Sequence, residues 1–455
     1  MSARYVIIGA GPAGIRAAQI LVEAGIRPVV IDEASRSGGQ IYRRQPSGFT
    51  RSYSALYGSE AVKAQAVHDA ADRVLAQCDY RPDTLAWAIY DKQVHVTTHG
   101  RAEVVEYDRL LIAAGATDRL LPLPGWTTPG TFTLGGAQIA LKAQGCAIGS
   151  KVAFVGTGPL LYLVAFQYAK AGANLVGVFD TTPALTRLKG VVGLAARPRL
   201  LALGLYYALR LCLKGVSLKT GVVPVAIEGG DTVRALRYRD ASGNERHVDC
   251  DAVGMGYHLR AEAQLADLAR CRFAYSEQHR QWLPEVDSDG RTSVPGVYMA
   301  GDCVRLLGAD GAEISGRLAA YAALVDERQP IPQANVHALR SAQQVMERFQ
   351  RGVAAAFPLP VANLKSLPDD TLICRCEAIT VGTLKATLAS GNAPEANRAK
   401  ALTRVGMGRC QGRFCAIAGA ELMAQCLGVS PCEAGRLRAA APIKQLPLGT
   451  DQESR

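Results

Sequence analysis

The start of the chain carries a glycine-rich turn, and this turn constrains the fold more than any other feature. Residues 5–8 are apolar, Gly9-Ala10-Gly11-Pro12-Ala13-Gly14 follows, and a helical pattern continues to Ala24 before a second predicted strand at 27–31. Between a strand and a helix, the spacing G-x-G-x-x-G permits a tight turn and close approach of a pyrophosphate to the helix N-terminus. The predicted dinucleotide site includes Gly9, Gly11, Pro12, Ala13 and Gly14.

An acidic residue stands where such a site needs one. Asp32 directly follows the second predicted strand, and Glu33 is next to it. A carboxylate at this position accepts hydrogen bonds from ribose hydroxyls. We expect Asp32 to take this role, with Glu33 as the alternative.

Three later segments favour FAD over NAD as the ligand. Residues 38–42, 110–116 and 297–302 resemble, in this order, the flavin-lining segment, the strand-to-loop crossing and the late FAD fingerprint of two-dinucleotide flavoproteins. Each run alone is also compatible with a buried strand and a turn, so their order carries the resemblance. The resemblance implies FAD contacts at Gly39, Gln40, Ala114, Gly115, Gly301 and Asp302.

A second nucleotide-binding unit follows at 151–180. Its glycine-rich turn reads Gly156-Thr157-Gly158-Pro159-Leu160-Leu161, so Leu161 replaces the third glycine, which normally allows close packing of helix and strand. This replacement weakens the case for a working nicotinamide site, and Asp180 at the end of the next predicted strand would repel the 2′-phosphate of NADPH. A vestigial domain or one that binds an adenine nucleotide such as ATP or ADP is favoured over an NAD site.

Two close cysteine pairs lie near the C-terminus. They are Cys374-Arg375-Cys376 and Cys410 to Cys415, and the second pair begins within the glycine-rich stretch 406–412. Four thiolates can hold a [2Fe-2S] cluster, and backbone N–H groups of glycine-rich loops can approach its anionic sulfides. Arg404, Arg409 and Arg413 add positive charge. Zinc, a dithiol pair and plain buried thiols are the alternatives, although Cys-x-Cys is an unusual spacing for zinc.

The cysteine-containing segment 371–427 resembles the bacterioferritin-associated-ferredoxin-like (BFD-like) [2Fe-2S] domain. This resemblance implies that the cluster ligands are Cys374, Cys376, Cys410 and Cys415. The expected fold is α/β, namely a two-dinucleotide-binding, glutathione-reductase-like flavoprotein fold followed by this small helical domain. We expect an FAD domain at 1–126 and 256–330, an NAD(P)-binding-like domain at 127–255, a connector at 331–370 and the cluster domain with its tail at 371–455.

The spacing of the remaining cysteines argues against disulfide reduction. No Cys-x-x-Cys occurs in the chain, and no cysteine stands between Gly39 and Cys78, where a flavin disulfide reductase needs a redox pair. No nucleophile motif or acid/base pair is recognisable either, and His258 is expected to be a packed or solvated residue. We therefore predict no catalytic residue in this chain.

The formal charge of +11 is spread along the sequence, without a basic run that would indicate nucleic acid. The apolar stretch Leu200–Leu209 is too short to span a bilayer, so we expect either a buried helix or an apolar surface that contacts a partner subunit. No signal peptide is recognisable, and the scattered cysteines indicate a reducing compartment. We expect a location in the bacterial cytoplasm, with peripheral attachment to the inner membrane as an option.

Nearly the whole chain resembles the large electron-transfer subunit of heteromeric bacterial flavin dehydrogenases, the family of opine oxidases, hydrogen cyanide synthase and D-hydroxyproline dehydrogenases. The resemblance implies a D-amino-acid-oxidase-like β-subunit that oxidises a secondary amine or amino acid, FAD here as electron acceptor, and exit of single electrons through the cluster to a downstream acceptor. Some relatives add an FMN at the subunit interface and a small ferredoxin-like subunit. The alternative is a stand-alone NAD(P)H-dependent flavin/iron–sulfur reductase.

Overall fold

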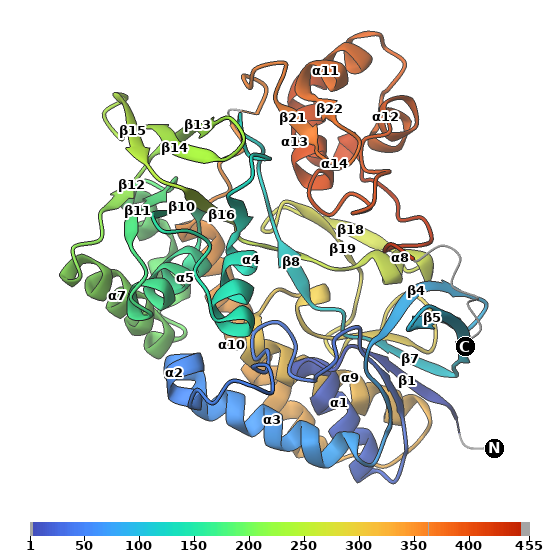
Figure 1. Cartoon of the computed structure of the whole chain (residues 1–455). Coiled ribbons are helices and arrows are strands. Elements are labelled where there is room, and N and C mark those ends of the chain that lie inside the picture. The colour runs from blue at the N-terminus through green and yellow to red at the C-terminus, as the bar shows by residue number, and fades with distance from the viewer. Residues whose placement is uncertain (1–2, 363, 447–455) are drawn as a thin grey trace, which may run out of the picture.

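The computed structural model describes residues 3–362 and 364–446, and its first layer is a five-stranded parallel sheet. The sheet lies between helices α1 (Pro12–Glu23), α3 (Ala61–Leu75) and α9 (Gly308–Asp326) on one face and a small antiparallel sheet on the other (Figure 1). The four residues of its first strand are all buried, as expected for a parallel sheet covered on both faces. Its strand order is β20 (Val297–Met299), β7 (Arg109–Ile112), β1 (Tyr5–Ile8), β2 (Val29–Ile31) and β3 (Asp79–Arg81).

A small antiparallel sheet accompanies the first parallel sheet. Its three strands are β4 (Thr84–Tyr90), β5 (Gln93–Thr98) and β6 (Arg101–Glu106). They are inserted between β3 and β7, so they extend the first layer without interrupting its central strands.

A second parallel sheet repeats the same plan, as the duplicated glycine-rich turn predicts. Helices α5 (Pro159–Lys170) and α7 (Pro198–Leu213) pack on one another beside it. A three-stranded antiparallel sheet formed by β13 (Val223–Gly229), β14 (Val233–Arg239) and β15 (Glu245–Asp249) extends from it. The strand order is β12 (Leu218–Thr220), β11 (Leu175–Asp180), β10 (Val152–Thr157), β16 (Ala252–Tyr257) and β9 (Thr131–Thr133).

Two short antiparallel strands connect the sheets. In the outward connection β8 (Ala116–Asp118) follows β7, and in the return connection β17 (Leu259–Ala261) follows β16. Thr117 and Arg260 are register partners in this pair. This crossing joins the two nucleotide-binding domains.

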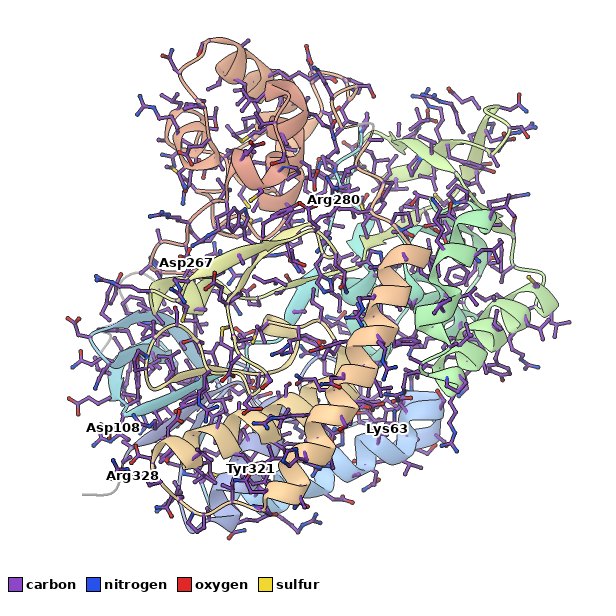
Figure 2. The ribbon with its side chains drawn as sticks, turned by 180° about the vertical axis from the view of Figure 1, so that it is seen from behind. Lys63, Asp108, Asp267, Arg280, Tyr321 and Arg328 are labelled. Carbon is purple, nitrogen blue, oxygen red and sulfur yellow. The ribbon has the colours of Figure 1, made fainter. Side chains whose placement is uncertain are left out.

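Helix α10 (Gln333–Ala356) lies within residues 331–370, where a connector is expected. It runs across the back of the molecule (Figure 2) and packs on the 3₁₀ segment η3 (Ala184–Gly190) and on α6 (Val191–Leu194). Gly352 permits this approach, because a Cβ there would lie 2.4 Å from the backbone nitrogen of Leu194.

The C-terminal unit is small and mostly helical, and it lies above the long hairpin β18 (Phe273–Ser276) and β19 (Gln281–Pro284) in Figure 1. Residues 447–455 of the predicted cluster domain and tail lie outside the described residues. Across the described part of the chain, no helix is long and apolar enough to cross a membrane. The unit contains β21 (Leu372–Cys374), β22 (Ile379–Thr380), α11 (Val381–Ala389), α12 (Ala396–Thr403), α13 (Ala416–Leu427) and α14 (Pro431–Ala434).

Candidate functional site

The N-terminal turn has the shape of an anion site. Helix α1 begins with Pro12 after Gly11, and no side chain caps its N-terminus, so its first N–H groups remain available for a ligand. Two glycines are required by close approach: a Cβ at Gly14 would lie 1.8 Å from the carbonyl oxygen of Gly9, and a Cβ at Gly9 would lie 2.4 Å from that of Ala113.

The turn and the predicted flavin-lining segment meet at Gly11 and Gly39. A Cβ at Gly11 would have only the Cα of Gly39 near it, at 3.5 Å, and Gly39 adopts a φ of +69°. The N–H of Gly38 donates to the carbonyl of Ala10 at 2.9 Å, which fixes this contact. Beside it, Gln40 accepts from Arg43 at 2.7 Å.

Asp32 is held at the end of β2 by the backbone. Its carboxylate accepts hydrogen bonds from the N–H of Ala10 and, at 2.7 Å, from that of Ala34. Burial raises the pKa of Asp32, while these two N–H groups oppose the shift. Glu33 instead pairs with Lys444 of the C-terminal tail, so Asp32 is the acid that belongs to the turn.

The segments that follow β7 and β20 lie at the same edge of the first parallel sheet as the glycine-rich turn and Asp32. Ala114 and Gly115 follow β7, and a Cβ at Gly115 would meet nothing within 4 Å, which leaves space beside the backbone. Gly301 donates its N–H to Ser315 Oγ at 2.8 Å, and Asp302 accepts from the N–H of Gly308 at 2.9 Å. Enclosure raises the pKa of the Asp302 carboxyl. An uncapped helix terminus, an acid at the strand end and open glycines fit an extended dinucleotide.

In the second unit the acid at the end of β11, Asp180, is not accessible, which corrects the expectation for this residue. Its side chain is fully buried, accepts from Tyr162 and from the N–H of Thr182 at 2.8 Å each, and forms a 2.8 Å ion pair with Arg187. Burial raises its pKa, and these partners oppose the shift. Because Arg187 neutralises it and it is out of reach, Asp180 cannot repel a 2′-phosphate as expected.

The side chain of His258 lies against the second glycine-rich turn, at Gly158. A Cβ at Gly158 would lie 2.9 Å from His258 Nδ1, and His258 Nε2 donates to the carbonyl of Phe357 at 2.6 Å. Burial lowers the pKa of His258 to about 4, so the ring is neutral at physiological pH. His258 is a packed residue, as predicted, and Leu161 is buried in the core of the second domain.

The four C-terminal cysteines lie together as two pairs. Cys374 interacts with Cys415, and Cys376 interacts with Cys410. Within residues 3–362 and 364–446, no three His, Cys, Asp or Glu side chains form a cage for a single metal ion. Two adjacent thiol pairs match a binuclear cluster, in which each iron takes two thiolates.

Backbone N–H groups surround these thiols. The neighbouring Cys415 thiol lowers the pKa of Cys374 to about 6, and the N–H groups of Gly406, Glu377 and Cys376 act in the same direction. Gly406 has a φ of +81°, and a Cβ at Gly408 would lie 2.3 Å from the Cβ of Cys376. Arg404 pairs with Glu377 at 2.7 Å, whereas the exposed Arg409 forms no ion pair among the described residues.

The sequence did not reveal how the two predicted sites are joined. Glu262 donates its N–H to the carbonyl of Gly115 at 3.0 Å, and its carboxylate pairs with Arg413, which lies between Cys410 and Cys415. Gln264 donates to the carbonyl of Gln411 at 2.6 Å. One signal of this junction was present in the sequence. The charged residues Arg260 and Glu262 alternate with Ala261 shortly after the buried strand β16.

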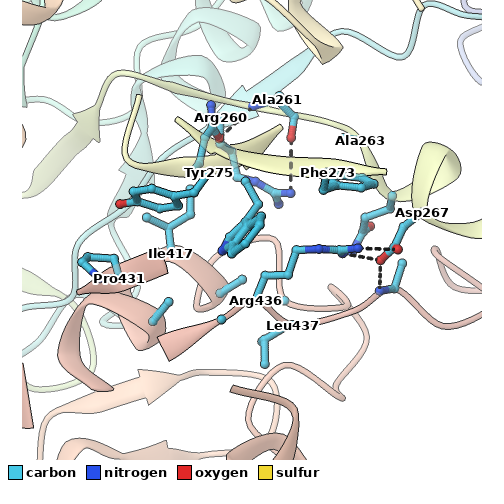
Figure 3. Close-up of a pocket in the computed structure, with 18 of the residues that line it drawn as sticks. Arg260, Ala261, Ala263, Asp267, Phe273, Tyr275, Ile417, Pro431, Arg436 and Leu437 are labelled. Carbon is cyan, nitrogen blue, oxygen red and sulfur yellow. Dashed lines mark hydrogen bonds and ion pairs between the residues drawn. The ribbon is translucent and has the colours of Figure 1, made fainter. Parts of the chain in front are cut away.

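A cavity of about 100 Å³ lies beside this junction, between the β18–β19 hairpin and the C-terminal unit (Figure 3). Arg436 spans it by pairing with Asp267 at 2.6 Å and placing its guanidinium 4.0 Å from the centre of the Phe273 ring. Arg280 forms a two-bond pair with Glu421 of α13. These contacts fix the C-terminal unit on the first domain.

Comparison with known proteins assigns both parts of the chain. Residues 3–342 match the pyridine nucleotide-disulphide oxidoreductase family, and residues 372–425 match the BFD-like [2Fe-2S] binding domain. One subunit of the opine oxidase of Agrobacterium tumefaciens is 36% identical over 97% of this chain and 90% of its own length. The HcnB subunit of hydrogen cyanide synthase from Pseudomonas protegens is 30% identical, and the match covers 100% of this chain and 99% of HcnB.

Solved structures share the fold at lower identity. L-Proline dehydrogenase from P. horikoshii superposes with a TM-score of 0.71 at 19% identity, covering 98% of this chain and 78% of that chain. Thioredoxin reductase of T. acidophilum superposes with a TM-score of 0.53 at 19% identity, covering 72% of this chain and 99% of that chain. The chain is an oxidoreductase with FAD and a [2Fe-2S] cluster as its cofactors, and it belongs to the pyridine nucleotide-disulphide oxidoreductase family, within the group that includes HcnB and this opine oxidase subunit.

Proposed function

We propose that this chain is the electron-transfer subunit of a heteromeric amino-acid or opine dehydrogenase. The observation that carries the proposal is the short link Gly115–Glu262–Arg413, which joins the predicted flavin site to the loop between two of the cluster cysteines. When bound, FAD takes up electrons in pairs and a [2Fe-2S] cluster passes them on singly. The residues of this chain would hold both groups next to one another.

The roles of individual residues follow from their geometry. The uncapped start of α1 would bind the pyrophosphate, Asp32 the ribose, and Gly39, Gln40, Ala114, Gly115, Gly301 and Asp302 would surround the remaining FAD. Four thiolates, from Cys374, Cys376, Cys410 and Cys415, would ligate the cluster, two to each iron. The enclosure of Asp302 and the buried Glu262–Arg413 pair would exclude water from the space between.

The substrate would be oxidised in a partner subunit. The names of the relatives, a subunit of an opine oxidase and a subunit of hydrogen cyanide synthase, support the existence of a partner subunit. The family resemblance of the sequence implies that this partner is D-amino-acid-oxidase-like and acts at the C–N bond of a secondary amine or amino acid. The absence of a nucleophile motif or an acid/base pair in this sequence agrees with that division. A stand-alone NAD(P)H-dependent reductase is disfavoured, because Asp180 is buried and His258 lies against Gly158.

Reconstitution tests the division of labour. The isolated chain should not oxidise opines, prolines or glycine with an artificial acceptor, whereas co-expression with the D-amino-acid-oxidase-like partner should give activity. Brisk oxidation by the isolated chain would disprove the proposal.

The cluster is tested separately by Cys410→Ser, which should abolish the visible absorption of the cluster and leave FAD bound. The exposed Cys432, changed to Ser, is the matched control and should retain both.

A further inference from the structure

Helix α7 presents an apolar face to solvent at the outer edge of the second domain (Figure 1). The side chains of Leu205, Leu209 and Leu213 are 65, 58 and 70% exposed, and Tyr206 is 46% exposed. At 3.6 residues per turn these positions fall within about 100° of the helix circumference. The opposite face is buried, with Tyr207 stacked on Phe166 of α5 at 4.7 Å. The helix is therefore apolar both on its buried face, which includes Leu211, and on the face that it presents to solvent.

Positive charge flanks this face without acidic compensation. Between Asp180 and Glu228 the sequence has no acidic residue. Arg199, Arg210 and Lys214 follow the edge of the apolar face on the helical wheel. The basic residues of this segment are Arg187, Lys189, Arg197, Arg199, Arg210, Lys214 and Lys219. Across the described residues, only Arg187 and Arg197 of this set form ion pairs.

The same segment exposes further aliphatic side chains just before α7. Leu185, Leu188 and Val192 are 79, 67 and 90% exposed, although the opposite side of this region packs against α10. Isolated exposed apolar residues are ordinary on protein surfaces, but groups of them rimmed by polar residues mark interaction sites. The group here is leucine-rich and is accompanied by basic residues alone.

We propose that the α7 face docks this protein on the surface of an anionic lipid bilayer. Leucines would enter the boundary between headgroups and acyl chains, and the flanking basic side chains would contact anionic headgroups, as in interfacial amphipathic helices. The choice of occupant rests on charge complementarity: the segment between Asp180 and Glu228 has basic residues and no acidic one, and the surface of an anionic bilayer is negative. The face is on the second domain, so docking would leave the C-terminal unit uncovered (Figure 1).

Vesicle co-sedimentation of the full-length, cofactor-loaded chain tests this. Vesicles of phosphatidylcholine with phosphatidylglycerol should bind it, phosphatidylcholine alone should bind it weakly, and added salt should release it. Arg199→Gln and Arg210→Gln should each weaken binding about fivefold, and Leu205→Gln with Leu209→Gln should abolish it. Arg101→Gln and Val62→Gln, at exposed positions on other elements, are the matched controls and should bind like the unchanged chain.

Three outcomes would overturn the proposal. These are no binding to the anionic vesicles, equal binding to both kinds of vesicle, and binding that the α7 variants leave unchanged. Self-association that disappears with the leucine variants, without vesicle binding, would assign the face to a second copy and also overturn it. Retained flavin absorption and an unchanged circular-dichroism spectrum show that each variant is folded.

Discussion

Glu262 and Arg413 form a buried ion pair, with Nε and Oε2 2.8 Å apart and side chains 8% and 10% exposed. The pair joins β17, at the crossing between the two nucleotide-binding domains, to the loop between Cys410 and Cys415. Arg260 reinforces it by donating to the carbonyl of Arg413 at 3.1 Å. Two segments separated by about a third of the chain are thus locked together.

Removing one charge of this pair should loosen the C-terminal unit. Glu262→Gln keeps the size of the side chain but leaves Arg413 buried without its counter-charge, which costs about 3–5 kcal/mol. We expect a lower unfolding temperature and faster proteolytic release of the C-terminal unit. The control is Glu245→Gln in the exposed Arg237–Glu245 pair, which should change stability by less than about 0.5 kcal/mol. Equal effects of the two substitutions would contradict a special role for Glu262.

The same pair makes the protein sensitive to acid. Burial alone would raise the pKa of Glu262, but Arg260 and Arg413 outweigh it and the pKa is lowered. A carboxyl whose folded pKa lies below its unfolded value of about 4.3 stabilises the protein fully above that value and loses this contribution as the pH falls through the folded pKa. The free energy of unfolding, measured with denaturant between about pH 5 and pH 3, should therefore fall less steeply in Glu262→Gln. Parallel curves for the two proteins would refute this.

The local patterns were readable from the sequence because each is short and continuous. The strand at Tyr5–Ile8, the glycine-rich turn and the helix from Pro12 were predicted from periodicity and glycine spacing, and the structure contains them. The roles of Asp180 and Glu33 depend on their ion-pair partners: Arg187 lies 7 residues from Asp180 but is brought to it by the turn after β11, and Lys444 lies 411 residues from Glu33. Of the two alternatives for Leu200–Leu209, the buried helix is wrong because Leu205, Tyr206 and Leu209 are exposed, and the contact with a partner subunit stays a prediction.

The contact between domains was equally hidden. Glu262 and Arg413 are each ordinary surface residue types, and they meet only because β17 pairs with β8 and the C-terminal unit packs on the residues that follow β17. Long-range pairing depends on tertiary packing that one sequence does not display. The cysteines were different, because two tight pairs of a rare residue type limit the possible chemistry before any fold is known.

Nicotinamide nucleotides should not reduce the flavin. Asp180 is fully buried and paired with Arg187, so it cannot accept hydrogen bonds from a ribose, and His258 lies against the second glycine-rich turn. We expect the flavin absorption to persist after anaerobic addition of NADH or NADPH, while dithionite bleaches it in the same sample. Rapid bleaching by NADH would restore the stand-alone reductase as the function.

A single methyl group at Gly11 should separate cofactor binding from folding. The backbone of Gly11 has a φ of −82°, which alanine adopts without strain, and a Cβ there would have only Gly39 Cα near it, at 3.5 Å. The methyl group would occupy the space through which a pyrophosphate approaches the start of α1. Gly11→Ala should therefore fold and keep its [2Fe-2S] absorption but lose at least about tenfold in FAD affinity, the equivalent of about 1.4 kcal/mol. Gly204→Ala, in α7 with nothing near its Cβ, should bind FAD normally and be more stable by about 0.5–1 kcal/mol. Unchanged FAD content in Gly11→Ala would place the dinucleotide elsewhere.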